Sequence, residues 1–366
     1  MKTFLLVFGT RPEAIKLAPV IRELRCREGV RLYIAVSGQH REMLDEVLVR
    51  FDIRPDFDLS VMREGQSLAL LTSRILLGVD RLLTELSPDV VIVHGDTTTA
   101  FASSLAAFYR SVPVAHIEAG LRTHDMQNPF PEDYNRRAIA LATRYHFAPT
   151  AMARDQLLGE GVERSRVHLV GNTVIDTLGL TVCEDFRHIL LDWVSGSRFI
   201  LVTAHRRENL GLPMQKSLSQ FRRVLDAYPS VKAILPMHKN PAVREVVTRV
   251  FCGCESIRLV EPLDVFTFHN LLFRSDFVVS DSGGIQEEAA ALHKPVLVMR
   301  DVTERPEGEV SGGLRTVGTD GEKIARAFRL LMNDEMAYRA MATAENPFGD
   351  GHASERIADI LTGKGT

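Results

Sequence analysis

Acidic side chains follow two apolar runs of the sequence, and a third opens a helical run further along. Asp96 comes after the run DVVIVHG, Glu118 ends VPVAHI, and Glu132 follows a polar loop with two prolines. When carboxyl groups gather in one site, one can have a raised pKa while another stays ionised, which suits acid and base roles. These three residues are candidates for proton transfer. Capping of the next helix is the default interpretation of Asp96, and the threonines at 97–99 would cap it equally well.

Residues 281–288 read DSGGIQEE after the apolar run DFVVS. Asp281 or Ser282 can cap a helix here, and the two glycines would let an anion approach the backbone N–H groups. Glu287 and Glu288 lie a turn further in, where a carboxylate can bind a sugar diol. A nucleotide would use both features, whereas an ordinary capped helix with acidic residues is the simpler interpretation of these eight residues alone.

Basic side chains stand in two similar turns. In GTRPEAIK, Gly9 permits a tight bend, Arg11 can bind an anion through two N–H groups, and Lys16 lies one turn into the expected helix. Such cations are usually solvated, so this turn alone does not establish a site. His205, which follows RFILVTA, lies beside two arginines and a glutamate. A lone histidine is more often structural than catalytic. With these charged neighbours, the functional and the structural interpretation of His205 are equally well supported.

Most of these residues stand where a short apolar run ends and a helical pattern begins. The alternation predicts an α/β fold with parallel sheets covered on both faces. Ligands of such sheets bind beyond the carboxyl ends of the strands. The rhythm pauses after Val182 and restarts at RFILVTA. We therefore expect two doubly wound, Rossmann-like domains that join near residue 180.

Composition excludes several classes of protein. The chain has 366 residues, which exceeds the usual size of a single core, and its net charge of −3 argues against nucleic acid as a partner. We expect no membrane span, because no apolar stretch is long enough, and the N-terminal apolar run is too short for a signal peptide. The four cysteines lack the spacing of a zinc site and suit free thiols in a reducing cytoplasm: Cys26, Cys183, Cys252 and Cys254.

Together the motifs resemble one family along most of the chain. The chain resembles the non-hydrolysing UDP-N-acetylglucosamine 2-epimerases in eight segments. These are GTRPEAIKLAPV, GQHREMLDEVL, HGDTTTA, HIEAGLRT, PFPEDYNRR, VGNTVIDTL, VTAHRREN and DSGGIQEEAAALHKPVLVMRDVTERPE. That family is similar in fold to the GT-B glycosyltransferases, with two Rossmann-like domains facing a central cleft. The resemblance implies a first domain over 1–180, completed by a returning helix at about 350–366, and a UDP-binding domain over 181–349.

The resemblance implies interconversion of UDP-N-acetylglucosamine and UDP-N-acetylmannosamine, without metal or other cofactor, by elimination and re-addition of UDP. Asp96, Glu118 and Glu132 would be the acid/base carboxylates, with the assignment of base and acid left open. His205 would contact the diphosphate and help UDP leave. Ten further substrate contacts are implied: Arg11, Ser282, Gly283 and Gly284 for the diphosphate, Glu288 for the ribose hydroxyls, Phe268 for the uracil face, and Lys16, Arg136, His238 and Arg305 as a cationic lining.

Many bacterial members of this family bind a second, activating substrate molecule. Six positions of this sequence correspond to that possible allosteric site, namely Gln39, His40, Glu42, Gln66, Arg137 and Arg206. Three features depart from the pattern, because Gly65 replaces an arginine, Glu42 a glutamine, and Arg137 brings an unusual positive charge. We hypothesise that activation is weakened or recognises another sugar. Asn128, in place of a commoner serine, makes a modified substrate conceivable.

Other functions remain open at this stage. A GT-B glycosyltransferase would share the nucleotide site but need an acceptor site, and a hydrolysing relative would release the free sugar. A nucleotide-sugar-binding regulator without catalysis would not need the three acids and the histidine, all of which are intact. The resemblance further implies a cytoplasmic homodimer.

Overall fold

The computed structural model describes the chain except residues 39–40, 64, 128, 206–209, 304 and 365–366, and the side chains of 41–43. Contacts divide the chain into two compact units. Unit 1 comprises Met1–Leu180 and Gly349–Thr366, and unit 2 comprises Thr181–Phe348. The chain thus leaves unit 1, forms all of unit 2, and returns to unit 1 with its last helix.

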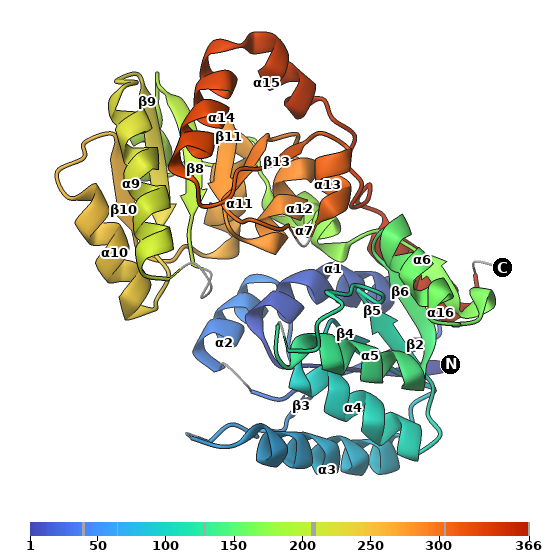
Figure 1. Ribbon diagram of the computed structural model, residues 1–366. Helices are drawn as coiled ribbons and strands as arrows, with labels where there is room; N and C mark the ends of the chain where they lie inside the picture. The colour runs from blue at the N-terminus through green and yellow to red at the C-terminus, as the bar shows by residue number, and fades with distance from the viewer. Residues whose placement is uncertain (39–40, 64, 128, 206–209, 304, 365–366) are drawn as a thin grey trace. The chain divides into compact units, whose positions relative to one another are not determined.

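Unit 1, whose first part runs from blue to green in Figure 1, is built on a parallel sheet. This sheet has seven strands over the described residues, in the order β3-β2-β1-β4-β5-β6-β7. Its central strands are continuous apolar runs because helices cover both faces. Along β1, Phe4, Leu6 and Phe8 enter one core, and Leu5 and Val7 enter the core on the opposite face. The strands are β1 (Lys2–Phe8), β2 (Val30–Val36), β3 (Phe57–Asp58), β4 (Val90–His94), β5 (Val114–Ile117), β6 (Thr143–Ala148) and β7 (Val167–Leu169).

Helices α1 and α16 pack together on one face of this sheet, and α3 and α4 on the other. The apolar stripe of α16 enters the core of unit 1 through Ile357, Ala358 and Leu361. The helices are α1 (Arg11–Cys26), α2 (Arg41–Arg50), α3 (Leu68–Leu86), α4 (Thr98–Tyr109), α5 (Glu132–Ala142), α6 (Ala151–Gly159), α7 (Thr173–Thr181) and α16 (Ala353–Thr362), with a 3₁₀ turn, η1 (Arg164–Arg166).

Unit 2 repeats the architecture with a parallel sheet of six strands among its described residues, ordered β10-β9-β8-β11-β12-β13. Helices α9, α10 and α14 bury their apolar stripes against one face. The strands are β8 (Arg198–Thr203), β9 (Val231–Pro236), β10 (Ile257–Val260), β11 (Phe277–Ser280), β12 (Val296–Val298) and β13 (Leu314–Thr316). The helices are α8 (Ile189–Val194), α9 (Leu212–Asp226), α10 (Pro241–Phe251), α11 (Val265–Arg274), α12 (Gly283–Ala291), α13 (Pro306–Val310), α14 (Gly321–Asn333) and α15 (Glu335–Ala342).

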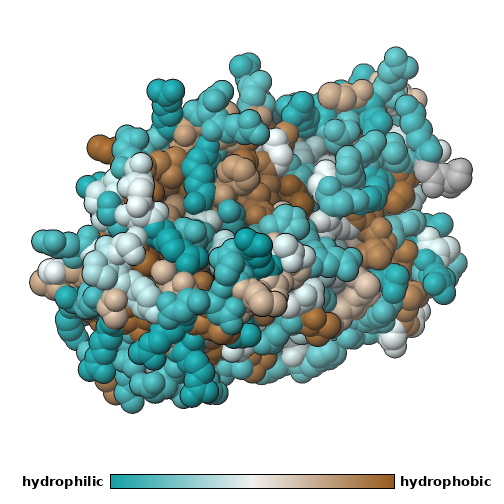
Figure 2. Space-filling view, turned by 90° about the horizontal axis from the view of Figure 1, so that it is seen from above, coloured by the Kyte–Doolittle hydropathy of each residue, from teal (hydrophilic) through white to brown (hydrophobic). Residues whose placement is uncertain are grey.

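The predicted fold class of two Rossmann-like, parallel-sheet α/β domains is confirmed. No helix in the described part of the chain is long and apolar enough to cross a membrane. The four cysteines are free thiols. Figure 2 shows one face of the surface, on which hydrophilic side chains predominate and hydrophobic ones lie between them.

Candidate functional site

The ends of β4 and β5 bring two of the predicted carboxylates together in unit 1. These strands are neighbours, and Asp96 and Glu118 follow their last residues. Arg136 of α5 donates hydrogen bonds to Asp96 Oδ2 and to Glu118 Oε2, the latter at 3.3 Å. Its other terminal nitrogen donates to the main-chain oxygen of Glu118. One buried guanidinium therefore joins both strand ends.

Lys16 supplies a second cation to the same cluster. It lies on α1, which begins at Arg11, and its ammonium donates to Glu118 Oε1. Burial by itself raises the pKa of Glu118, but the charges of Lys16 and Arg136 oppose it, and the pKa ends well below its usual range. Although burial also lowers the pKa of Arg136, its two carboxylate partners raise it. Glu118 is thus a carboxylate at neutral pH.

Helix α5 positions the third carboxylate. Glu132 is the first residue of α5 and lies one turn before Arg136, so both side chains occupy one face of the helix. Asn135 of the same helix donates to the main-chain oxygen of Asp96 at 2.9 Å. The helix is therefore fixed to the loop after β4, and it presents Glu132 on the same face as the arginine that binds Asp96 and Glu118.

The default interpretation of Asp96 as a helix cap is wrong. Thr97 is the N-cap of α4, and its hydroxyl accepts the N–H of Ala100 at 3.1 Å. The carboxylate of Asp96 instead binds Arg136. Among the alternatives, a threonine performs the capping and leaves the aspartate to the charged cluster.

The backbone after β5 adopts a conformation that most residues avoid. Glu118 has φ +62° and Gly120 has φ +91°. A Cβ atom on Gly120 would lie 2.2 Å from the main-chain oxygen of Ala153. A glutamate in the left-handed region costs free energy, and such strain is concentrated at functional sites.

In unit 2, Asp281 holds the predicted histidine. The backbone N–H of His205 donates to Asp281 Oδ1 at 3.1 Å and to Oδ2 at 2.9 Å, and the ring Nδ1 lies 3.2 Å from Oδ1. The imidazole also stacks on His238, with ring centroids 5.7 Å apart. Asp281 therefore orients His205, and the prediction that Asp281 might cap the next helix is wrong.

The glycine turn opens α12 as predicted. Ser282 is the N-cap residue, but its side chain makes no capping hydrogen bond, and its N–H donates to Ser280 Oγ at 2.9 Å. The first amides of a helix have no partner within the helix, so the turn at Gly283 and Gly284 offers N–H donors to an anion. A Cβ atom on Gly284 would meet nothing within 4 Å, which leaves room for a ligand.

The two glutamates of α12 have different partners. Glu287 is buried and accepts a hydrogen bond from Arg305, whereas Glu288 Oε2 lies 3.6 Å from His269 Nε2. Only Glu288 thus remains a candidate for a sugar diol. Phe268 lies on α11 and makes an edge contact with the His269 ring, at a centroid distance of 6.3 Å.

The predicted allosteric residues are only partly described. Gln39, His40 and Arg206 lie outside the described residues, as does Asn128, and the side chain of Glu42 is among those not described. The Gln66 amide oxygen accepts a hydrogen bond from Arg74 at 2.7 Å. Arg137 binds Asp133 Oδ2 at 2.7 Å.

Sequence reasoning missed several residues of these clusters. The contact of Asn135 with Asp96 spans 39 positions and has no local signal. His94 is buried at the end of β4, where burial lowers the pKa of its imidazole to about 4 and keeps it neutral. It could have been noticed as a polar residue within an apolar run. Among the described residues, there is no group of three or more His, Cys, Asp or Glu side chains that could hold a metal ion.

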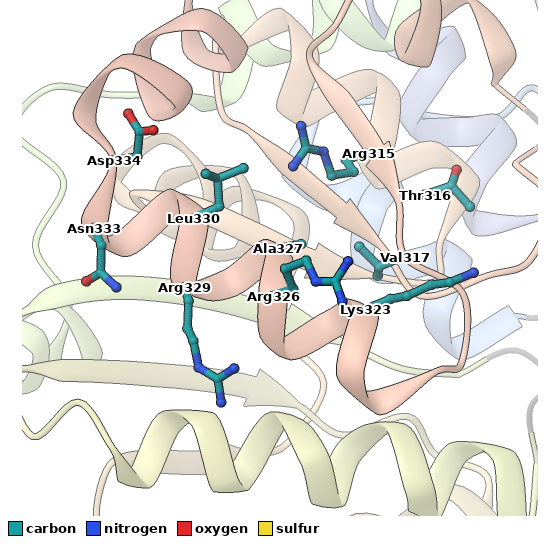
Figure 3. A pocket seen from close by; sticks show the side chains of 10 residues that line it. All are labelled: Arg315, Thr316, Val317, Lys323, Arg326, Ala327, Arg329, Leu330, Asn333 and Asp334. Atoms are coloured by element: carbon teal, nitrogen blue, oxygen red, sulfur yellow. The ribbon is translucent and has the colours of Figure 1, made fainter.

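A separate cavity of about 520 Å³ lies beside β13 and α14 in unit 2 (Figure 3). Figure 3 shows Arg315 extending from β13, and Lys323 and Arg326 from α14. Basic side chains at a surface cavity are normally solvated, and none of the predicted site residues lines this one. Its lining consists of Arg315, Thr316, Val317, Lys323, Arg326, Ala327, Arg329, Leu330, Asn333 and Asp334.

Comparison with known proteins gives concordant matches. The family model described as UDP-N-acetylglucosamine 2-epimerase matches residues 22–362. The chain is 49% identical over 355 residues to the UDP-N-acetylglucosamine 2-epimerase of Bacillus subtilis, covering 97% of this chain and 93% of that protein. A structure of S. aureus MnaA with UDP is 46% identical in sequence, with a TM-score of 0.92. The match covers 100% of this chain and 97% of that chain. The Neisseria meningitidis UDP-GlcNAc 2-epimerase bound to UDP-GlcNAc is 42% identical, with a TM-score of 0.92 and coverage of 99% and 100%.

Proposed function

The chain belongs to the UDP-N-acetylglucosamine 2-epimerase family, and from that premise we propose that it interconverts UDP-N-acetylglucosamine and UDP-N-acetylmannosamine. The observation that carries the proposal is the cluster in which the buried Arg136 joins Asp96 and Glu118. Inversion at C2 requires proton transfer on both faces of the sugar, and hence at least two acid/base groups. Clustered carboxylates of unequal environment meet that requirement.

The reaction proceeds by elimination and re-addition. A base removes the C2 proton while the bond between C1 and the diphosphate oxygen breaks, so that UDP leaves with the bonding electrons and C1 and C2 become doubly bonded. An acid then returns a proton to the opposite face of C2, and the diphosphate oxygen re-forms its bond to C1. Departure of a stabilised diphosphate is necessary because C2 is not next to a carbonyl and its proton is otherwise not acidic.

The environment of each carboxylate limits its role in this scheme. Glu118 starts ionised, because Lys16 and Arg136 hold its pKa low, so its first step can only be acceptance of a proton. Glu132 lies on the helix face of Arg136, and we assign it with Asp96 to the remaining proton transfers. The low pKa makes Glu118 a weak base in the absence of substrate, and the anionic substrate must draw Lys16 away from it to strengthen it.

Unit 2 supplies the nucleotide site in this proposal. The N–H groups at the start of α12 bind the diphosphate, and Glu288 binds the ribose hydroxyls. His205, oriented by Asp281, contacts the diphosphate and assists the departure of UDP. Arg305, held by Glu287, contributes positive charge beside it.

A proton NMR time course of purified protein with UDP-N-acetylglucosamine in ordinary water tests the proposed activity, with no metal or nicotinamide cofactor added. We expect signals of the UDP-linked manno epimer to grow to an equilibrium, and the same mixture to form from UDP-N-acetylmannosamine. Free N-acetylmannosamine would identify a hydrolysing enzyme, and transfer of sugar to an added acceptor would identify a glycosyltransferase. Unchanged substrate would contradict the proposal, and other N-acetylated UDP-sugars would then be tried.

We also propose that activation by a second substrate molecule is weakened. Arg137 donates from Nε to Asp133, and the Gln66 amide oxygen accepts from Arg74, so both side chains already have partners within the chain. Initial rates against UDP-N-acetylglucosamine concentration should follow a hyperbola. A strongly sigmoidal curve would contradict this part of the proposal.

A cytoplasmic homodimer is the proposed form of the enzyme. Three large apolar side chains on α3 and α4 are more than half exposed: Leu77 at 56%, Phe108 at 58% and Tyr109 at 67%. The ion pair of Asp80 with Arg110 brings the segments that carry them together. Light scattering on a sizing column should give twice the mass of the chain, and substitution of Leu77 and Phe108 by serine should give the mass of one chain.

A further inference from the structure

A buried carboxylate outside the predicted set connects two loops of the candidate site. Glu13 lies in the first turn of α1 and is only 2% exposed. Its Oε2 atom accepts hydrogen bonds from the Gly9 N–H at 3.0 Å, the Thr10 N–H at 2.8 Å and the Thr10 hydroxyl at 2.8 Å. Its Oε1 atom accepts the hydroxyl of Thr97 at 2.8 Å.

The bond to Thr97 is what distinguishes Glu13 from an ordinary helix-capping glutamate. A glutamate at this position of a helix commonly accepts the N–H of the cap residue, here Thr10, and that contact is local. Thr97 lies 84 positions further along and directly follows Asp96. The same Thr97 hydroxyl caps α4. Glu13 therefore joins Gly9 and Thr10, in the loop after β1, to the loop after β4, which carries Asp96.

The surrounding contacts show how closely the loops fit. Asp96 is bound on its carboxylate by Arg136 and on its main-chain oxygen by Asn135, both from α5. Glu13 provides a further support from α1, through the next residue, Thr97. A Cβ atom on Gly9 would lie 2.0 Å from Ser37 Oγ, so the loops after β1 and β2 leave no space for adjustment.

We propose that Glu13 is a positioning residue, which as a carboxylate holds the Asp96 loop in register with α1 for proton transfer at C2. This inference rests on the proposed function. A displacement of about 1 Å in a catalytic group can reduce turnover roughly 100-fold, so the loss of one bond at this junction is expected to affect rate far more than substrate binding.

Protonation of Glu13 would remove the support that the hydrogen bond from Thr97 gives to the Asp96 loop. Burial raises the pKa of Glu13 to about 7, against the lowering effect of its four hydrogen bonds. All four come from neutral groups. The charged side chains nearest to these donors along the chain are Arg11 and Lys16 of α1 and Asp96, which Arg136 of α5 binds. Since three donors face Oε2, an added proton must reside on Oε1, which then becomes a donor, so the Thr97 hydroxyl loses this acceptor.

Steady-state kinetics of Glu13→Gln and Thr97→Val at pH 6 to 9 test the proposal. At pH 8 we expect kcat to fall about 10- to 100-fold in both variants, with KM changed less than about threefold. Thr97→Ser, which keeps the hydroxyl, should retain nearly the wild-type kcat. The double variant should be no slower than Glu13→Gln alone, because both changes remove the same bond. In the wild type, kcat should rise with pH through about 7, and this rise should be absent in Glu13→Gln.

Ser37→Ala is the matched control. It removes a buried hydroxyl from the same junction, where Ser37 Oγ lies 2.8 Å from Thr99 Oγ1, but it does not touch the Asp96 loop through Glu13. Its kcat should stay close to the wild-type value. Wild-type kcat and pH dependence in Glu13→Gln would overturn the proposal, and if that variant does not fold, equal kcat for Thr97→Val and Thr97→Ser would overturn it. No epimerisation by the wild type would instead refute the proposed function and, with it, this inference.

Discussion

At the scale of single residues, the site is organised by which cation touches which carboxylate. Arg136 contacts both Asp96 and Glu118, and Lys16 adds a second cation to Glu118. Glu132 is placed by its helix: it lies one turn before Arg136 on α5. Equal side-chain chemistry at the three positions therefore does not imply an equal electrostatic environment.

Replacing the carboxylates by amides should separate chemistry from nucleotide binding. Asp96→Asn and Glu132→Gln should each reduce kcat by at least about 100-fold, because proton transfer is lost, while the Kd for UDP, measured by calorimetry, should stay within about threefold. Asp155→Asn, which breaks an exposed pair with Arg154 in the same unit, is the control and should leave both quantities unchanged. Normal turnover in either test variant would remove that residue from the mechanism.

Glu13 should make the free energy of unfolding of unit 1 decrease as pH rises. Its folded pKa of about 7 exceeds its ordinary value of 4.5, so between these values the folded chain binds more protons than the unfolded chain. The stabilisation is fully present below about pH 4.5 and is lost as pH passes through 7. At roughly 1.4 kcal/mol per pKa unit, the change is about 3 kcal/mol.

Urea unfolding from pH 5 to pH 8 measures this effect. Relative to the wild type, Glu13→Gln should gain stability across that interval, because glutamine does not ionise. Parallel pH profiles for the two proteins would show that Glu13 is ionised throughout, and would contradict the raised pKa.

At the scale of elements, the left-handed turn after β5 needs glycine at one position. Gly120→Ala should destabilise unit 1 by about 2 to 6 kcal/mol, from a positive φ and the close approach to the Ala153 oxygen. Gly159→Ala is the control, since Gly159 is helical and a Cβ atom there meets nothing within 4 Å. It should stabilise the unit by up to about 1 kcal/mol. Thermal unfolding measures both, and equal midpoints for the two variants would contradict the geometry of this turn.

The sequence predicted the strands well, because buried parallel strands are continuous apolar runs. DVVIVHG, VPVAHI and RFILVTA correspond to β4, β5 and β8. Capping was harder to predict, since an aspartate and a threonine at a strand end carry the same local signal. The difference between Asp96 and Thr97 is decided by Arg136, 40 positions away from Asp96. Glu13 was missed for a related reason, because a glutamate after Thr-Arg-Pro is already explained by the helix start.

At the scale of the whole molecule, two units with separate cores carry separate parts of the proposed chemistry. The acid/base carboxylates belong to unit 1, and the glycine turn with His205 belongs to unit 2. The pause after Val182 predicted a boundary near residue 180, and the resemblance to the family implied that the last helix returns to the first domain. The electrostatic state of the cluster was not predictable, because the low pKa of Glu118 depends on Lys16, which is 102 positions away in the chain.

The central claim is that this cluster exchanges the C2 proton of a UDP-sugar, and deuterium incorporation tests it most directly. UDP-N-acetylglucosamine would be incubated with the protein in deuterated water, and C2 of the recovered substrate and of the manno epimer examined by NMR. We predict deuterium at C2 of the epimer from its first appearance. With Glu118→Gln we predict no deuterium at C2 of either sugar. Epimer formed with its original C2 proton retained would contradict the proposed transfer between separate acid and base groups.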